Sequence, residues 1–462
     1  MKRLNKLNIL IVAVIAVVLF FAGSYSTESK VEKYPPHVNP ERIVLTWNNA
    51  VHNSQAVTWR TSVDVKSGMV QWVKAVNSAD EILDPTQKKA ITKTFKSDVN
   101  EANYHCATMT DLLPETNYMY RVGDGKNWSE WFQFTTAKSE ADDFSFLYFG
   151  DLQNGIKQHC SRVIRNAYTS CTDAAFMLFG GDLVNDPEDN QWGEWFESGD
   201  WIYASVPVMA AAGNHEYKRQ LIGGLGEHWK YQFNFPTNGP EGLQASVYYF
   251  DYQGVRFVVL DTEGMSDGIM GSYEKQRDWL EETLANNPYK WSVVTLHHPF
   301  LSNRKGRNND ELKNLVKPVF DKYDVDLVLQ GHDHTYGRTG FLTETENKGP
   351  VYVTSVAGSK MYVAEPKEEM QRMASSTQLY QKVDVKENSI LFSTYTVNGN
   401  LYDQFILQKD EKGNKELIEL IPEGQDERLN LPRAYKENRS EKELQEYQIK
   451  LDNRKNNLQA NT

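Results

Sequence analysis

The pattern of apolar and polar positions changes once along the chain, near Ala141. Before that point, from Arg42 to about Thr136, short runs rich in β-branched and aromatic residues are separated by turn residues. Such runs are typical of short antiparallel strands and predict a small all-β sandwich. The predicted strands cover residues 43–47, 56–61, 69–73, 104–109, 118–122 and 131–135.

After Ala141, apolar runs alternate with segments of helical periodicity, which predicts an α/β domain. Helices are expected at 273–284 and at 310–323, where Asp310 is a candidate N-cap. Strand-like runs return between Val351 and Leu407, and the charged end of the chain predicts an exposed helix or disorder. The other predicted strands of this domain cover 144–149, 175–179, 206–211, 255–260, 293–296 and 327–329.

The N-terminus has the residue order of a secretory signal. Basic residues precede an uncharged apolar run, 9–23, that ends in small residues. The run is shorter than the roughly 20 residues that span a bilayer, so a cleaved signal is favoured over a retained membrane anchor. The protein is therefore expected to be exported and to be secreted, periplasmic or attached to the cell envelope. The expected organisation is signal or anchor 1–27, linker 28–40, sandwich 41–138, α/β domain 142–423 and charged tail 424–462.

Charge and cysteine content narrow the classes of function. The formal net charge is −12, from 50 Lys and Arg against 62 Asp and Glu. A nucleic-acid-binding surface would need a basic stripe, so none is expected. A small phosphorylated substrate remains compatible, because metal ions can supply positive charge locally. Three cysteines cannot form a disulfide scaffold; Cys160 and Cys171 pair, or all three stay as thiols.

Polar motifs follow several of the α/β strands. They are Gly150-Asp151, Gly181-Asp182, Gly213-Asn214-His215-Glu216, His297-His298-Pro299 and Gly331-His332-Asp333-His334. In open α/β sheets the carboxyl ends of the strands form the edge where ligands bind, so these side chains are expected to converge. Any one of these motifs alone is common in loops without a functional role. The whole ordered set, with each motif after a strand, is improbable by chance. Asp, Asn and His without thiolate suit Zn, Mn or Fe, and a bridging carboxylate can hold two ions about 3.5–4 Å apart.

The ordered motifs resemble the calcineurin-like metallophosphoesterase superfamily. In the first domain, residues 112–118 follow the pattern L-x-P-x-T-x-Y, which is similar to the E–F corner of fibronectin type III domains, where the Tyr hydroxyl bonds back to the backbone. A fibronectin-like sandwich before the motifs, with Tyr336 and Arg338 after the last His, is similar to purple acid phosphatases and their bacterial relatives. The resemblance covers residues 38–410. It implies an all-β sandwich followed by an α/β metallophosphoesterase domain, a β-sheet sandwich flanked by helices.

The resemblance also implies two metal sites. The first would be held by Asp151, Asp182 and His334, and the second by Asp182, Asn214, His297 and His332, with Asp182 bridging. A hydroxide held by the metals would attack phosphorus, and His215 would assist the leaving group as a general acid or by stabilising developing charge. The expected activity is that of an acid phosphatase-like phosphomonoesterase acting on a small phosphorylated substrate.

Two positions depart from the family pattern. Purple acid phosphatases carry a Tyr ligand where this chain has Asn185, and many other superfamily members carry His where it has Gln153. Both replacements are neutral amides. A pair of divalent ions drawn from Fe, Zn or Mn is therefore favoured, with Asn185, Gln153 or water completing the shell, and no purple colour is expected.

The loop at 302–309 follows His-x-Pro and is basic. Arg307 is the preferred phosphate contact, because Gly306 lets the loop bend and Arg binds phosphate oxygens in a bidentate way. Arg304 and His298 are further candidates for substrate binding, and a solvated basic loop is the alternative. For the whole protein, a phosphodiesterase with the same site and a catalytically weak binding or adhesion protein of the cell envelope are the competing interpretations.

Overall fold

The computed structural model describes residues 30–218, 224–266, 272–343 and 348–460. The chain divides into two units, Met1–Lys33 and Tyr34–Thr462, and the account below concerns the second. The expected targeting segment, 1–27, lies outside the described residues. Over the described ranges, none of the helices combines the length and the apolar character that a membrane crossing requires.

The first domain is a sandwich of two antiparallel four-stranded sheets. One sheet has the order β1 (Glu41–Thr46), β2 (Gln55–Ser62), β6 (Glu101–Met109), β5 (Ile91–Lys96), and the other β4 (Thr86–Lys89), β3 (Met69–Lys74), β7 (Asn117–Gly123), β8 (Phe132–Thr135). All the strands predicted for this domain are confirmed, and β4 and β5 are additional. A 3-10 turn, η1 (Ala79–Glu81), precedes β4. The expected tyrosine corner is present, because the Leu113 amide donates to the Tyr118 hydroxyl at 2.9 Å.

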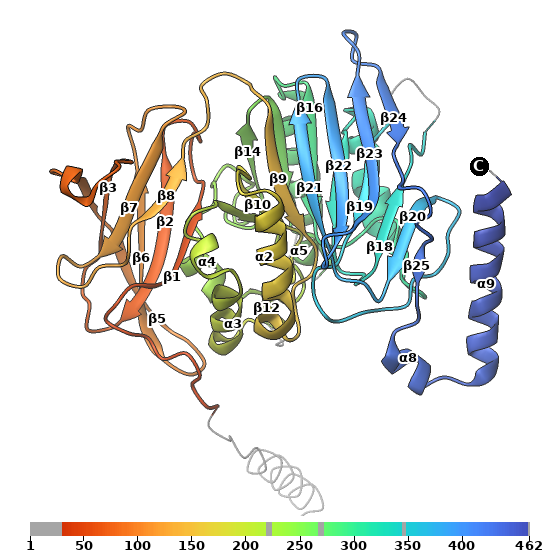
Figure 1. Cartoon of the computed structure of the whole chain (residues 1–462), viewed down its shortest axis with the longest axis horizontal. Helices are drawn as coiled ribbons and strands as arrows, with labels where there is room; N and C mark the ends of the chain where they lie inside the picture. Colours follow the sequence, from red (N-terminus) through yellow and green to blue (C-terminus); the bar gives the residue numbers. More distant parts are fainter. Residues whose placement is uncertain (1–29, 219–223, 267–271, 344–347, 461–462) are drawn as a thin grey trace, which may run out of the picture. The chain divides into compact units, whose positions relative to one another are not determined.

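The second domain contains two large mixed sheets (Figure 1). The seven-stranded sheet has the order β11 (Val208–Ala210), β10 (Met177–Phe179), β9 (Phe144–Phe149), β21 (Leu379–Lys386), β22 (Ser389–Thr396), β23 (Leu401–Lys409), β24 (Lys415–Glu419). The eight-stranded sheet has the order β14 (Tyr248–Tyr252), β15 (Val255–Val259), β16 (Trp291–Leu296), β17 (Leu327–Gln330), β19 (Val351–Thr354), β18 (Tyr336–Thr339), β20 (Met370–Ser375), β25 (Arg428–Leu429). A short ribbon joins β12 (Tyr217–Lys218) to β13 (Gly224–Leu225).

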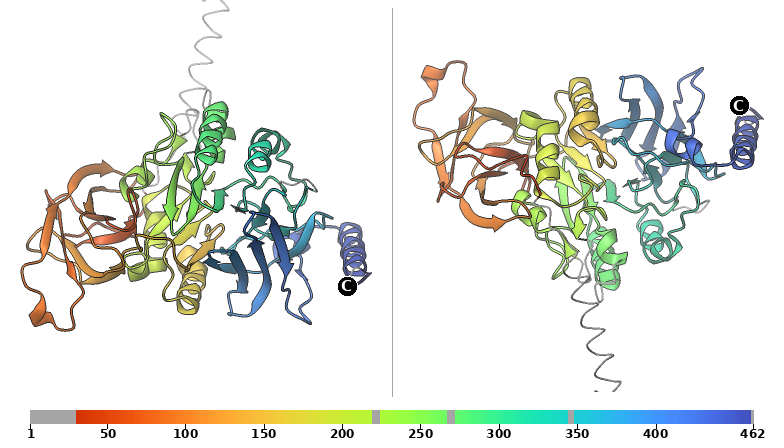
Figure 2. Two further views of the ribbon diagram at one scale, coloured as in Figure 1. Left: turned by 90° about the horizontal axis from the view of Figure 1, so that it is seen from above. Right: turned by 90° about the horizontal axis from the view of Figure 1, so that it is seen from below.

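Helices lie beside both sheets (Figure 2). They are the π-helical turn η2 (Ile156–Cys160), α2 (Ser161–Ser170), α3 (Asp189–Gly199), the 3-10 turn η3 (Asp200–Ile202), α4 (Glu227–Gln232), α5 (Thr262–Ser266), α6 (Ser272–Ala285), α7 (Asp310–Lys322), α8 (Arg433–Glu437) and α9 (Glu441–Ala460). The two predicted helices are confirmed as α6 and α7. The N-cap of α7 is Asn309 rather than Asp310, because Asp310 is already the first helical residue.

The two faces of the eight-stranded sheet pack against different layers of the domain. On β15, Phe257 and Val259 pack into the core between the two sheets, whereas Val258 packs with the helices α6 and α7. Leu327 and Val328 on β17 divide in the same way. Strand side chains alternate between faces, so an all-apolar run is buried on both sides. The predicted β-sheet sandwich flanked by helices is confirmed.

The charged end of the chain is folded. Helix α9 docks through Arg454, which donates to Glu427 at 2.6 Å and to the Met370 carbonyl at 2.9 Å. The Tyr447 hydroxyl donates to the Ala364 carbonyl at 2.6 Å. The tail thereby holds residues 364–370, the last part of the loop that joins β19 to β20. All three cysteines are free thiols, so Cys160 and Cys171 are not paired.

The sandwich packs directly against the second domain. We call the group Arg42, Arg60, Asn100, Asp189 and His228 the Asp189 cluster. Arg42 and Arg60 come from the sandwich, and each donates to the Asp189 carboxylate, at 2.9 and 3.0 Å. Asp189 is fully buried, so this is a buried ionic contact between the domains.

Candidate dinuclear metal centre

The predicted ligands converge at one edge of the second domain. Asp151, Asp182 and Asn214 follow the parallel strands β9, β10 and β11, while the histidines follow the parallel strands β16 and β17. Two groups of side chains could each hold a metal ion, with their ligand atoms within 4.8 Å of one another. The groups are Asp151, Asp182, His334 and Asp182, His297, His332. Asp182 is the residue that they share.

The second group is centred on the His297 ring. His297 Nδ1 donates to the Gly180 carbonyl at 2.8 Å, which directs Nε2 into the group. Around Nε2 lie Asp182 Oδ2 at 3.2 Å, Asn214 Oδ1 at 3.2 Å and His332 Nδ1 at 3.0 Å. Oxygen and imidazole donors that point at one another in a buried space fit a transition-metal ion better than they fit each other.

The first group consists of Asp151, Asp182 and His334, and a neutral amide points into it. His334 Nε2 lies 3.6 Å from Asp151 Oδ1, and His334 Nδ1 donates to the Lys360 carbonyl at 2.8 Å. The Gln153 amide nitrogen points into the group, 2.5 Å from Asp182 Oδ2 and 2.9 Å from His334 Nε2. Gln153 would have to turn its amide to offer oxygen to a metal. Asn185 lies elsewhere: its amide donates to Asp186 at 2.7 Å, and its carbonyl contacts His215 Nδ1.

The glycines of the motifs allow the loops to approach one another. A Cβ on Gly213 would lie 2.2 Å from Asp182 Oδ1, and one on Gly331 would lie 2.8 Å from Asp151 Oδ2. The ligand residues themselves carry backbone strain, since Asp182, His332 and His334 have φ values of 53°, 68° and 49°. Non-glycine residues rarely adopt this left-handed region, and such strain gathers at functional sites. The short Gly-containing motifs are therefore a consequence of crowding around the ligands.

Glu216 ties two ligand loops together, a role that the sequence did not reveal. Its buried carboxylate accepts the amides of Asp182 at 2.8 Å, Leu183 at 2.8 Å, Val184 at 3.3 Å and Gly213 at 2.7 Å. One side chain thereby fixes the loop after β10 to the loop after β11. Its position next to His215 was the available signal, because a buried acid in a strand-end motif needs donors.

The electrostatics of the site reflect an excess of buried negative charge. Burial lowers the pKa of His297, but the charges of Asp182 and Asp151 outweigh it and raise that pKa to about 10. Burial and the charge of Asp182 raise the pKa of Asp151 well above its ordinary value. Burial lowers the pKa of His334 to about 3. Binding of a metal cation among these groups would be favourable. The cation would neutralise the carboxylates, and the neutral imidazole nitrogens could coordinate it.

A pocket of about 320 Å³ opens above the two groups. Its lining includes His215, Arg307 and two residues that the sequence did not single out, Lys360 and Tyr362. Arg307 donates to the His332 carbonyl and to Asp333, both at 2.9 Å. The other two predicted substrate contacts lie outside the lining. Arg304 stacks on the Tyr362 ring at 3.9 Å, and His298 bonds to the Thr262 hydroxyl at 2.9 Å.

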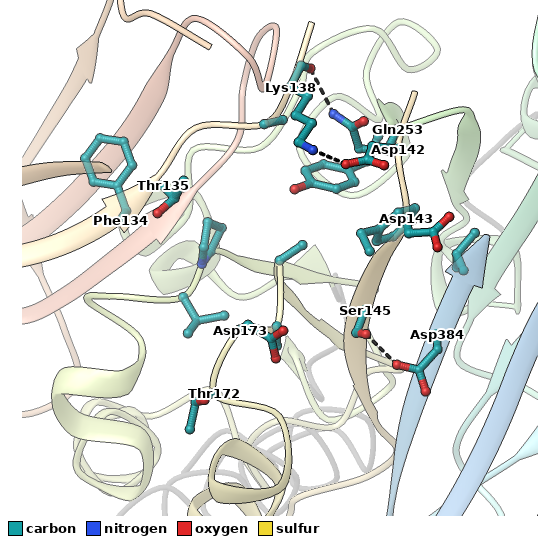
Figure 3. A pocket seen from close by; sticks show the side chains of 18 of the residues that line it. Phe134, Thr135, Lys138, Asp142, Asp143, Ser145, Thr172, Asp173, Gln253 and Asp384 are labelled. Carbon is teal, nitrogen blue, oxygen red and sulfur yellow. Dashed lines mark hydrogen bonds and ion pairs between the residues drawn. The ribbon is translucent and has the colours of Figure 1, made fainter. Parts of the chain in front are cut away.

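A larger cavity of about 900 Å³ lies at the other ends of the same strands (Figure 3). It is lined by the residues that precede β9, β10 and β11, together with the end of the sandwich. Its polar groups already contact one another, as Lys138 does with Asp142 and Ser145 with Asp384. None of the predicted ligands lines it.

Comparisons with known proteins agree with this geometry. Residues 40–136 match the family described as purple acid phosphatase, N-terminal domain, and residues 144–336 match calcineurin-like phosphoesterase. The chain is a purple acid phosphatase-like member of the calcineurin-like phosphoesterases. Its second domain is that of a phosphoester hydrolase. The family resemblance and the fold expected from the sequence are thus confirmed.

Individual relatives span most of this phosphatase-like chain. Acid phosphatase type 7 of Danio rerio is 28% identical over 82% of the chain and 93% of its own length. Fe(3+)-Zn(2+) purple acid phosphatase 12 of Arabidopsis thaliana is 24% identical over 76% of the chain and 82% of its own length. A purple acid phosphatase from yellow lupin seeds shares the fold, with a TM-score of 0.66, 18% identity, and coverage of 81% of this chain and 75% of that one.

Proposed function

We propose that this protein is an exported phosphomonoesterase with a dinuclear metal site. The observation that carries the proposal is the pair of donor groups that share Asp182 at the floor of the pocket. Asp151, Asp182 and His334 would hold one ion, and Asp182, Asn214, His297 and His332 the other. When bound, the two ions would lower the pKa of a water molecule and neutralise the phosphoryl oxygens.

His215 is proposed to act on the leaving group. Its Nδ1 faces the Asn185 carbonyl, which can only accept, so Nδ1 carries a proton. Its Nε2 lies 3.9 Å from Asp182 Oδ2, and both residues line the pocket. A protonated Nε2 could donate to the ester oxygen as the bond to phosphorus breaks.

The role of His215 can be separated from binding. We expect His215→Asn to lower kcat roughly 10²- to 10⁴-fold on an alkyl phosphate, and less on p-nitrophenyl phosphate, whose leaving group is stable as an anion. Rates measured over a series of leaving groups give this dependence. An equal loss for every leaving group would contradict proton donation.

The first metal is proposed to be divalent. A Tyr ligand is missing at Asn185, whose side chain binds Asp186, and the neutral Gln153 amide contacts Asp182 and His334 of the first group. Neutral oxygen donors favour Fe(III) less than a phenolate does. The iron-loaded protein should therefore show no tyrosinate absorption band in the visible region, and the appearance of such a band would refute this assignment.

The function itself is tested by a metal-reconstituted activity screen. p-Nitrophenyl phosphate and bis-p-nitrophenyl phosphate would be compared with Mn, Zn and Fe, with Asp182→Ala as the control. The proposal expects metal-dependent turnover with preference for the monoester. Preference for the diester would indicate a phosphodiesterase, and metal binding without turnover would indicate a binding protein of the cell envelope.

Export and domain boundaries are proposed from the sequence pattern. The basic, apolar and small-residue order of 1–27 supports a cleaved signal over an anchor, followed by the linker 28–40 and the domains 41–138 and 142–423. Mass spectrometry of the mature protein from its native host tests this directly. A full-length N-terminus in the membrane fraction would favour the anchor.

A further inference from the structure

Lys360 is joined to the first donor group in two ways. It lies on the loop that follows β19 and lines the pocket. Its carbonyl accepts His334 Nδ1 at 2.8 Å, and its ammonium donates to Gln153 Oε1 at 3.2 Å. Both the main chain and the side chain of this residue are thus fixed beside groups proposed to hold metal.

The charge of Lys360 is not neutralised by an acid in the described part of the chain. Among the described residues, the only hydrogen bond of its ammonium is to the neutral Gln153 amide. Arg307, the other cation of the lining, is already paired with Asp333 at 2.9 Å. Of these two cations in the lining, the ammonium of Lys360 is therefore the one that can pair with an anionic ligand.

The loop that carries Lys360 is itself held in place, and its Tyr362 ring lies 5.5 Å from the Lys360 ammonium. Tyr362 packs edge-on against the His334 ring at 4.7 Å and carries Arg304 on its face at 3.9 Å. The backbone of Ala364 forms a bridge with Arg304 and accepts the Tyr447 hydroxyl of α9. A cation supported in this way loses less conformational entropy when it binds an anion.

We propose that Lys360 binds a non-bridging oxygen of the phosphoryl group and selects dianionic monoesters over monoanionic diesters. The proposal rests on the proposed function and names its substrate class. A compact ammonium attracts a dianion more strongly than a monoanion, because Coulomb attraction scales with the charge of the ligand. The neutral Gln153 contact can be exchanged for phosphate without leaving a carboxylate unpaired.

The test compares Lys360→Met with Lys360→Arg in the metal-loaded, full-length protein. Lys367→Met is the matched control, because Lys367 lies on the same loop and is absent from the pocket lining. For Lys360→Met, kcat/KM for p-nitrophenyl phosphate should fall roughly tenfold to a hundredfold, as for loss of a hydrogen bond to a charged group. The value for bis-p-nitrophenyl phosphate should change by less than about threefold, and Lys360→Arg should keep most of the monoester rate.

Binding of inorganic phosphate gives a readout that needs no turnover. Calorimetry should show a Kd for phosphate raised roughly tenfold or more by Lys360→Met, with the metal content of the protein unchanged. Equal losses on both esters, or a loss of metal, would overturn the proposal and make Lys360 a positioning residue for Gln153. If the wild-type protein hydrolyses neither ester, the proposed function fails, and an unchanged phosphate Kd in Lys360→Met then overturns this inference separately.

Discussion

The metal pocket and the Asp189 cluster both contain buried carboxylates, but the partners of those carboxylates differ. Asp189 receives Arg42 at 2.9 Å, Arg60 at 3.0 Å and Asn100 at 3.0 Å. Asp151 and Asp182 are equally buried, yet no Lys or Arg of the described residues forms an ion pair with either. They face imidazoles, an amide and backbone N–H groups instead.

The pKa values of the carboxyl groups record this difference. Burial raises the pKa of Asp189, but His228, Arg42 and Arg60 outweigh it and hold that pKa well below its ordinary value. Burial raises the pKa of Asp151, and the neighbouring charge of Asp182 adds to it. The Asp189 cluster has two arginines for one acid and so carries no surplus negative charge, whereas the surplus negative charge of the metal pocket suits it to bind cations.

Removing the shared ligand should give the largest effect. Asp182→Ala takes a donor from both groups, so kcat/KM for p-nitrophenyl phosphate should fall at least on the order of 10³-fold in the presence of metal. Metal content, measured by plasma emission, should fall with it. Asp173→Ala, in the cavity at the opposite strand ends, is the control and should keep full activity. Activity that survives Asp182→Ala would show that the pocket is not the catalytic site.

Breaking the Asp189 cluster should affect folding instead. Asp189→Ala leaves Arg42 buried without its acid and Arg60 with Glu41 alone, so the free energy of unfolding should fall by about 3–5 kcal/mol in urea titration. The surface pair of Arg277 and Asp278 offers a control, since Asp278→Ala should cost less than about 1 kcal/mol. A loss of bound metal from folded Asp189→Ala protein would contradict the division between the two clusters.

The sequence predicts the metal pocket better than it predicts the Asp189 cluster. Each ligand motif is short and directly follows an apolar strand, so the topology alone brings Asp151 and His297 to one edge. Arg42 and Asp189 are 147 positions apart and carry no motif, so their contact depends on how the two domains dock. Lys360 was missed for the same reason, because only the tertiary path of its loop brings it to Gln153.

Two edge strands of the sandwich, β4 and β5, were not found by periodicity. Every residue of β4 is exposed, and Ile91 at the start of β5 is 67% exposed. Strands with at most one buried residue, such as β4 with none and β5 with Phe95 alone, show no sustained alternation of apolar and polar residues. The strands around the site are buried on both sides, so their apolar runs were easy to recognise.

Added metal should stabilise the protein through the pocket. A ligand at about 100 times its Kd contributes about 2.7 kcal/mol to the free energy of unfolding if it binds only the folded state. Unfolding with and without Mn or Zn measures this gain. Asp189→Ala should gain the same amount as the wild type, because the two clusters share no residue, and Asp182→Ala should gain little. Equal stabilisation of the wild type and Asp182→Ala would place the metal elsewhere.

The smallest effect expected concerns the support of the ligands rather than the ligands themselves. Glu216 accepts backbone amides from both the Asp182 loop and the Gly213 loop. In Glu216→Gln, one accepting oxygen becomes an amide nitrogen that faces donors, so one loop loses its anchor. Loss of such an outer contact costs roughly tenfold to a hundredfold in metal affinity.

Metal titration followed by activity should show that Glu216→Gln has a higher apparent Kd for the metal, with kcat recovered at saturating metal. Glu227→Gln, at an exposed pair with Lys218, is the matched control and should leave both values unchanged. A fall in kcat at saturating metal, with an unchanged Kd, would mean that Glu216 acts in the reaction and does not merely hold the loops.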